Sequence, residues 1–305
     1  MKAALLPDRS VIKLVGDSAR NFLHGLVTAD ILELTPGVAR FCALLTPQGK
    51  IIADFFVVQE AADGGFYLDI PRAQSAAVVE KLNLYKLRAK VGIENHTETY
   101  AVLAAWSAGP HVAPAPQAPE TGEAVGLTYQ DPRLPALGTR VILSPSLVAA
   151  ALAQFGATLV DASDYEAHRI ALGVPKGGTD FSYGDAFPHE SDMDQLGGVD
   201  FTKGCYVGQE VVSRMEHRGT ARTRAVPISY DEVAPRAGAP VTAGERQLGV
   251  MGSAAAGRGL ALLRLDRVAE AIAAGVPLSA GGVPIDLVKP EWAHFAFPGE
   301  NKAAE

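Results

Sequence analysis

Strand-like and helix-like spacings of apolar residues alternate over the first hundred residues. A helix is expected after Gly16, where apolar side chains recur at helical spacing, and a second helix over residues 74–87. The turn at residues 46–50 joins two apolar runs in the manner of a β-hairpin. The order β-α-β-β-β-α-β predicts helices packed on a largely antiparallel sheet, an α+β arrangement. The expected strands are residues 11–15, 41–45, 51–58 and 66–70.

The middle of the chain repeats this mixed pattern after a break. Residues 108–122 hold four prolines and little apolar material, so we expect an exposed linker there. A second α+β stretch covers residues 125–172, with a strand at 139–143 and a helix at 147–155. Residues 173–204 are rich in glycine, aspartate and proline without a regular period. A segment of this length without a pattern is typical of a functional region.

From residue 225 onward the pattern changes to short strands separated by glycine and proline, which predicts a small β-barrel or sandwich. The expected strands are residues 226–230, 247–253, 260–265 and 283–288. The predicted division is an N-terminal α+β domain at 1–107, a second α+β domain at 123–224 and a C-terminal β-barrel at 225–305.

Composition excludes several classes of protein. With 305 residues, 48% of them apolar and 20% charged, the chain is expected to be globular. The net charge of −7 argues against bulk, phosphate-driven binding to nucleic acid. We find no signal peptide at the start and no apolar run of membrane-spanning length. The sequence therefore predicts a cytoplasmic protein without a membrane partner.

The two cysteines are too few to hold a typical Fe–S cluster or a Cys₄ zinc site within the chain. Cys42 lies in an apolar run and is expected in the core. Cys205 comes just before a helix expected to begin near Val207, and Lys203 is close in sequence. A helix N-terminus and a nearby ammonium both favour a reactive thiolate. The alternative is that Cys205 is a small buried hydrophobic residue.

Four arginines, Arg214, Arg218, Arg222 and Arg224, fall within eleven residues downstream. Such a cluster suits carboxylates or phosphates, which a guanidinium binds with paired donors. The alternative is a solvated helix end. A module that docks on RNA through these arginines is a further hypothesis.

Residues 189–194 bring one histidine and three acidic residues together. A metal site is conceivable, but the segment completes no recognised ligand spacing, and an acidic loop or helix caps are favoured. We therefore predict no metal site. The sequence has no Walker loop, no dinucleotide-binding glycine pattern and no Gly-x-Ser-x-Gly elbow, so the common nucleotide-binding and hydrolase classes lose support.

Residues 203–210 read Lys-Gly-Cys-Tyr-Val-Gly-Gln-Glu. This segment matches the signature Lys-Gly-Cys-Tyr-x-Gly-Gln-Glu of the YgfZ-type folate-binding proteins. That family includes a mitochondrial iron–sulfur assembly factor and is related to the T-protein, the aminomethyltransferase of the glycine cleavage system. Residues 16–30, 47–50 and 193–201 resemble further parts of the family.

The resemblance implies two α+β domains in a ring around a central folate-binding channel, with a C-terminal β-barrel. It implies tetrahydrofolate as ligand and a role in assembling or repairing Fe–S clusters in a subset of enzymes, including tRNA-modifying ones. Fe–S client enzymes or assembly proteins would be the partners. Cys205 would be the functional thiolate, kept ionised by Lys203. The expected ligand-binding residues are Asp54, Tyr165, Tyr206, Gln209, Glu210, Arg214 and Arg218.

Two departures from the T-protein pattern bear on activity. T-proteins carry an acidic pair where this chain has Ala53 and Asp54, and a pterin-binding glutamate where it has Ala171. Losing that carboxylate would leave pterin donors unpaired, which costs about 1–3 kcal/mol if they are buried. The alternative function, a folate-dependent aminomethyltransferase, is therefore less well supported than an assembly factor. Tyr165 would be either a stacking surface for folate or a core aromatic.

Overall fold

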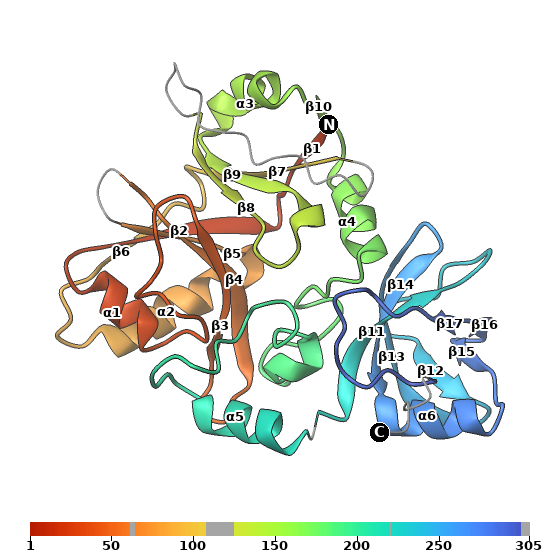
Figure 1. The fold of residues 1–305 in the computed structure, drawn as a ribbon. Helices are drawn as coiled ribbons and strands as arrows, with labels where there is room; N and C mark the ends of the chain where they lie inside the picture. Colours follow the sequence, from red (N-terminus) through yellow and green to blue (C-terminus); the bar gives the residue numbers. More distant parts are fainter. Residues whose placement is uncertain (62–64, 108–124, 220, 300–305) are drawn as a thin grey trace. The chain divides into compact units, whose positions relative to one another are not determined.

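A computed structural model describes residues 1–61, 65–107, 125–219 and 221–299 (Figure 1). The chain forms two compact units: unit 1 contains Met1–Tyr165 and Leu196–Gln209, and unit 2 contains Glu166–Gln195 and the residues from Glu210 onward. The linker expected at 108–122 lies outside the described residues. The division at 1–107, 123–224 and 225–305 stays a prediction, as do the ring and its channel.

The first sheet of unit 1 has five antiparallel strands in the order β3-β4-β5-β2-β6 (Figure 1). All four strands expected in this region are confirmed, and so are both helices. The elements are β2 (Arg9–Val15), α1 (Ala19–His24), β3 (Ala39–Leu45), β4 (Ile51–Gln59), β5 (Phe66–Pro71), η1 (Arg72–Gln74), α2 (Ser75–Lys86) and β6 (Gly92–Asn95).

Both faces of this sheet are covered, which explains why β4 is apolar along most of its length. Phe55 and Val57 are fully buried in a core that includes Leu82 of α2. Phe56 points to the opposite face, since side chains alternate along a strand. Its ring centroid lies 6.0 Å from that of Tyr129 in β8 (Leu127–Gln130).

The second sheet of unit 1 has the order β10-β1-β7-β9-β8, and only β1 and β10 pair in parallel. The strand expected at 139–143 and the helix at 147–155 are confirmed as β9 and α3. The sequence did not predict β1, whose four residues pair with a strand that lies about a hundred residues further along the chain. The elements are β1 (Lys2–Leu5), β7 (Ala101–Trp106), η2 (Pro135–Leu137), β9 (Thr139–Leu143), η3 (Pro145–Leu147), α3 (Val148–Phe155) and β10 (Thr158–Leu159).

A buried ionic network joins the two sheets of unit 1. Asp69 of β5 accepts hydrogen bonds from Arg9 Nε at 2.6 Å, the Tyr129 hydroxyl at 2.6 Å and Arg140 Nη1 at 2.9 Å. Arg140, in β9, also donates to the hydroxyl of Tyr165 at 3.3 Å. Asp69 is fully buried. A buried carboxylate is stabilised only when such partners surround it, so the network fixes one sheet against the other.

Residues 196–209 return to unit 1 and attach to its first sheet. The Thr28 hydroxyl donates to the Gly198 carbonyl at 2.5 Å, and the Thr28 carbonyl accepts from the Asp200 amide at 2.9 Å. Gly208 has φ +84°, and a Cβ there would lie 2.6 Å from the carbonyl oxygen of Thr46. Glycine is therefore required where this segment meets the turn between β3 and β4.

Unit 2 contains the C-terminal β-barrel, and this prediction is confirmed. Its seven strands have the order β16-β15-β12-β13-β14-β11-β17. The two edge strands, β16 and β17, are separated in sequence by Ile285 alone, so the sheet curls almost to closure. The strands are β11 (Thr223–Ser229), β12 (Pro240–Ala243), β13 (Arg246–Ala255), β14 (Arg258–Arg264), β15 (Leu278–Ala280), β16 (Val283–Pro284) and β17 (Asp286–Leu287).

Four helical segments accompany these elements, two of them at the borders of the units. Helix α6 was not predicted. It begins at Leu265, the last residue of the expected strand at 260–265. It packs Val268 and Ala271 into the barrel core. The segments are α4 (Ala162–Ala171), η4 (Pro188–Ser191), α5 (Gln209–Arg218) and α6 (Leu265–Ala273).

We predict that Asp69→Asn lowers the free energy of unfolding by about 3–5 kcal/mol, because it removes the buried charge that pairs with both Arg9 and Arg140 and leaves Arg140 with Asp131 as its remaining carboxylate partner. Guanidinium chloride unfolding followed by circular dichroism measures this loss. The control, Asp164→Asn, removes an exposed ion pair with Lys2 and should cost less than about 1 kcal/mol. Equal losses in the two variants would contradict the role of the network.

Gly208→Ala should destabilise the protein more than Gly197→Ala. Both glycines have positive φ, and the left-handed backbone alone costs an alanine about 1–2 kcal/mol. At Gly197 a Cβ meets no described atom within 4 Å, whereas at Gly208 it meets backbone. The unfolding midpoints of the two variants test whether residue 208 lies against the backbone of the turn after β3. Equal midpoints would disprove this contact.

Candidate functional site

The side chain of Lys203 supports the loop that carries Cys205. Its Nζ donates hydrogen bonds to the carbonyls of His24, Val27 and Ala29, at 2.6, 2.6 and 2.8 Å. An ammonium has three N–H donors, so each of them is satisfied. Burial lowers the pKa of Lys203 to about 8, which leaves the group charged at neutral pH. The loop is thus attached to the end of α1 through a charged side chain.

Asp200 fixes the turn that leads into this loop. Its Oδ1 accepts hydrogen bonds from the amides of Thr202 at 2.8 Å and Lys203 at 3.0 Å, and from the Thr202 hydroxyl at 2.7 Å. An aspartate that binds the backbone two residues further on stabilises a tight turn. The side chains of Asp200 and Lys203 therefore both hold the backbone before Cys205.

The two cysteines of the chain lie in opposite environments. Cys205 is exposed. Cys42, in β3, is fully buried, and its Sγ donates to the Phe55 carbonyl at 3.6 Å. Burial raises the pKa of the Cys42 thiol well above its ordinary value. Cys42 is therefore a core residue, as predicted, and Cys205 is the thiol that solvent and a partner can reach.

Tyr206 and His24 border the loop. Tyr206 is buried, its ring lies 5.2 Å from Lys203 Nζ, and its hydroxyl has no hydrogen-bond partner among the described residues. Burial raises the pKa of Tyr206 to about 12. The sequence did not single out His24. Its Nδ1 lies 3.2 Å from Asp30 Oδ1. Its Nε2 lies beside Gly204, 3.7 Å from the place where a Cβ atom would stand if residue 204 had one. Burial, followed by the charge of Lys203, lowers the pKa of His24.

Two predicted ligand-binding residues lie inside unit 1. Asp54, in β4, is buried opposite Ala43 of β3. Tyr165 is 2% exposed, and its ring packs edge-on against Trp106 with centroids 5.2 Å apart. This burial agrees with the core-aromatic alternative for Tyr165, and its stacking on folate stays a prediction. The role of Asp54 toward folate stays a prediction.

Helix α5 carries the other predicted ligand-binding residues. It begins at Gln209, two residues after the expected start. Glu210 and Arg214 form an exposed ion pair at 2.6 Å on one face of the helix, and Arg218 is exposed at its end. Their contacts with a ligand stay predictions. The exposed arginines can meet an anion from solvent.

Arg224 does not belong with these exposed arginines, so its assignment to the anion-binding cluster was wrong. It is buried, and its guanidinium donates to Asp192 at 2.9 Å and to both oxygens of Asp194 at 2.9 and 2.8 Å. The ring of Phe295 lies 4.4 Å away. Because internal carboxylates already bind it, Arg224 has no free face for an external anion.

Unit 2 contains Ala171, the residue expected to stand where T-proteins have a pterin-binding glutamate. Ala171 is exposed at the end of α4 and has no side-chain acceptor. Arg169, two residues before it, is buried and donates to Asp180 at 2.9 Å and to the Val174 carbonyl at 2.5 Å. This stretch therefore stabilises unit 2 and offers no carboxylate to a pterin ring.

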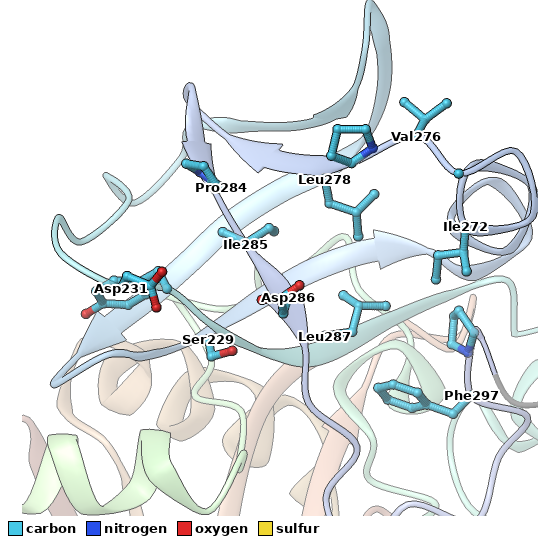
Figure 2. Close-up of a pocket in the computed structure, with 14 residues that line it drawn as sticks. Ser229, Asp231, Ile272, Val276, Leu278, Pro284, Ile285, Asp286, Leu287 and Phe297 are labelled. Atoms are coloured by element: carbon cyan, nitrogen blue, oxygen red, sulfur yellow. The ribbon is translucent and has the colours of Figure 1, made fainter.

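Each unit contains a cavity away from the predicted site residues. One of about 520 Å³ lies in the barrel unit, with Ile272, Leu278 and Phe297 among its apolar lining and Asp231 and Asp286 at its polar side (Figure 2). The other, of about 500 Å³, lies in unit 1. It is lined by Tyr67, Tyr100, Leu127, Ile142 and Leu147, among others. Neither cavity includes a predicted site residue in its described lining.

Two family models match the chain. The model described as "GCVT N-terminal domain" matches residues 9–115, and the model described as "CAF17, C-terminal beta-barrel domain" matches residues 222–295. The crystal structure of the glycine cleavage system aminomethyltransferase T from Bartonella henselae superposes with a TM-score of 0.74 at 16% identity, covering 97% of this chain and 87% of that one. At that identity the likeness shows the fold alone, and it confirms the predicted T-protein-like fold class.

Curated relatives are iron–sulfur cluster assembly factors. Human "Iron-sulfur cluster assembly factor IBA57, mitochondrial" is 31% identical over 282 residues, which cover 86% of this chain and 77% of that protein. The IBA57 homolog of Mycosarcoma maydis is 35% identical over 241 residues, covering 75% of this chain and 57% of that protein. The matched part thus spans little more than half the length of the fungal relative.

The predicted cytoplasmic location is corrected by these relatives. The human, mouse and fungal proteins are named as mitochondrial, which contradicts the prediction of a cytoplasmic location. The prediction relied on the lack of a secretory signal, which does not distinguish the cytoplasm from an organelle. Within the described ranges, no helix is long and apolar enough to cross a membrane.

Sequence identity, the two matched domains and the shared fold agree on one assignment. The identity to the human protein extends over most of both chains. The chain belongs to the IBA57 family of iron–sulfur cluster assembly factors.

Proposed function

We propose that this chain promotes the assembly or repair of Fe–S clusters in a subset of enzymes, with Cys205 as its functional thiol. The narrower YgfZ-type resemblance would add tRNA-modifying enzymes to the clients. The observation that carries the proposal is the contrast between an exposed Cys205 on an anchored loop and a fully buried Cys42.

The geometry supports transient contact rather than storage of a cluster by this chain alone. One accessible thiol cannot supply the four ligands of a typical cluster, so partner proteins must provide the rest. A loop held by Lys203 presents that thiol in a fixed position, which lowers the ordering cost when a partner binds. Cys205 therefore acts at a contact with an assembly protein or a client enzyme.

The exposed arginines of α5 give this contact a charge preference. Arg214 and Arg218 lie on the helix that follows the Cys205 loop in sequence, and Arg222 is exposed just beyond it. On a chain of net charge −7, they form a local basic stretch that favours an acidic partner surface. The same side chains would meet the glutamate tail of a folate.

Tetrahydrofolate fits the residues present only in part. The arginines suit its carboxylates, but Ala171 gives the pterin donors no acceptor, and Tyr165 is enclosed in unit 1. We therefore assign no chemical step to folate. The alternative function, aminomethyl transfer, is weakened by the absence of the same carboxylate from this chain. The chain also has a single acidic residue, Asp54, where T-proteins have two.

Cys205→Ala should abolish the ability of the chain to restore Fe–S enzyme activity in a strain that lacks it. Cys42→Ala is the matched control: it removes the buried thiol, and we expect activity to be restored in proportion to the amount of folded protein. The readout is the specific activity of Fe–S enzymes together with immunoblot levels of each variant. Full restoration by Cys205→Ala would refute a functional thiol.

Ala171→Glu should strengthen tetrahydrofolate binding, because it supplies the missing carboxylate at an exposed helix end. A hydrogen bond to a charged group is worth about 1.5–3 kcal/mol, so the dissociation constant should fall roughly tenfold or more. Isothermal titration of wild type, Ala171→Glu and the uncharged control Ala171→Gln measures this. Identical affinities for all three would show that the pterin does not bind beside residue 171.

A further inference from the structure

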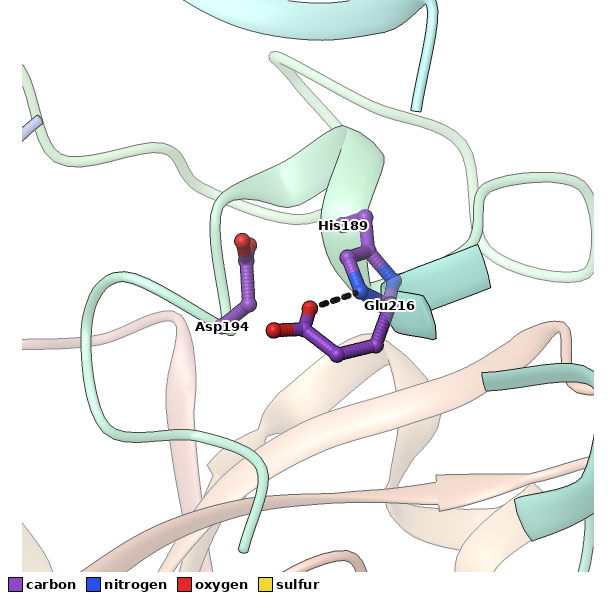
Figure 3. A group of neighbouring side chains, drawn as sticks. All are labelled: His189, Asp194 and Glu216. Atoms are coloured by element: carbon purple, nitrogen blue, oxygen red, sulfur yellow. Dashed lines mark hydrogen bonds and ion pairs between the residues drawn. The ribbon is translucent and has the colours of Figure 1, made fainter. Parts of the chain in front are cut away.

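We propose that His189, Asp194 and Glu216 form a binding site for a first-row divalent metal ion in unit 2. The proposal is independent of the function assigned to Cys205. Each residue offers one ligand atom, and these atoms all lie within 4.8 Å of one another (Figure 3). Two of the residues come from the segment before the Cys205 loop, and Glu216 comes from α5.

Burial and hydrogen bonds position two of the three side chains. His189 Nε2 and Glu216 Oε2 are 3.0 Å apart, and Figure 3 shows both groups facing each other beside Asp194. The side chains of His189 and Asp194 are 2% and 4% exposed, whereas that of Glu216 is 45% exposed. Two ligands are thus held in place by burial, and the third gives access from solvent.

The surroundings contain more acceptors than donors. A single guanidinium, that of Arg224, serves two buried carboxyl groups, Asp192 and Asp194. Asp192 is fully buried, and its Oδ2 has no hydrogen-bond partner among the described residues. Among the described residues, the carboxylate of Glu216 contacts the imidazole of His189. A cation bound by Asp194 and Glu216 would add positive charge where a single guanidinium serves two buried carboxyl groups.

Arg224 leaves Asp194 able to bind a metal. The guanidinium donates one hydrogen bond to each carboxylate oxygen of Asp194, at 2.9 and 2.8 Å, and Gln195 Nε2 donates to Oδ2 at 2.7 Å. A carboxylate has about four acceptor positions, so a lone pair on Oδ1 remains for a metal ion. In this arrangement Arg224 orients Asp194, as the outer partners of metal ligands commonly do.

The ligand set identifies the class of ion. One imidazole nitrogen and two carboxylate oxygens suit Mn²⁺, Fe²⁺, Co²⁺ or Zn²⁺, whereas Ca²⁺ and Mg²⁺ prefer sites made of oxygen alone. Three protein ligands leave coordination positions for water or for a ligand from another molecule. The site therefore suits an exchangeable ion.

Titration of Co²⁺ into the chelator-treated chain tests the site, by calorimetry and by visible absorption of the bound ion. Wild type and all variants carry Cys205→Ser, so that the exposed thiol cannot contribute. We expect one equivalent of Co²⁺ to bind. Glu216→Gln should weaken binding by about tenfold or more, because it removes a charged ligand without disturbing the core. Glu210→Gln, an exposed position on the same helix, should leave the affinity unchanged.

Three outcomes would overturn the proposal: no binding of Co²⁺, equal binding by the Glu216→Gln variant, or equal weakening by Glu216→Gln and Glu210→Gln. A shift of the His189 ring signals on addition of Zn²⁺, seen by nuclear magnetic resonance of the folded chain, would support it independently of the variants. Absence of that shift at saturating Zn²⁺ would count against it.

Discussion

The ammonium of Lys203, bound by three backbone carbonyls, is the contact on which the candidate site depends. It attaches residues 203–206 to the end of α1, so that the exposed thiol of Cys205 has a fixed position. The same contacts give three carbonyls at the end of α1 and just after it a charged donor. Gly208 completes the attachment where a side chain would strike the turn after β3. The charged side chain of Lys203 and the glycine at 208 thus both position the loop that carries the thiol.

Burial determines which arginines stabilise the fold and which are available to bind a ligand. Asp69 and Arg140 hold the sheets of unit 1 together, and Arg224 performs the corresponding task in unit 2. Among the described residues, exposed arginines such as Arg218 remain for an external anion. Buried cations therefore stabilise the fold, and exposed cations are available for recognition. The two cysteines differ in the same way, since Cys42 is buried and Cys205 is exposed.

Much of the fold could be predicted, because strands such as β4 and helices such as α2 have clear periods. The strand β1 could not, since both strands that pair with it, β7 and β10, lie about a hundred residues or more further along the chain. The signature identified Cys205, but residue spacing could not show that Lys203 binds carbonyls 174 to 179 positions away. Sequence proximity misassigned Arg224, and His24 offered no signal beyond its place in a segment that resembles the family.

Replacement of Lys203 by methionine tests the central claim most directly. The variant keeps Cys205 and the apolar part of the side chain but removes the bonds to the three carbonyls. The measurement is the restored specific activity of Fe–S enzymes, with thermal unfolding to confirm that the variant is folded. We expect the activity to be near that of the strain without the chain. Wild-type activity in a folded Lys203→Met protein would show that anchoring of the Cys205 loop is not what the function requires.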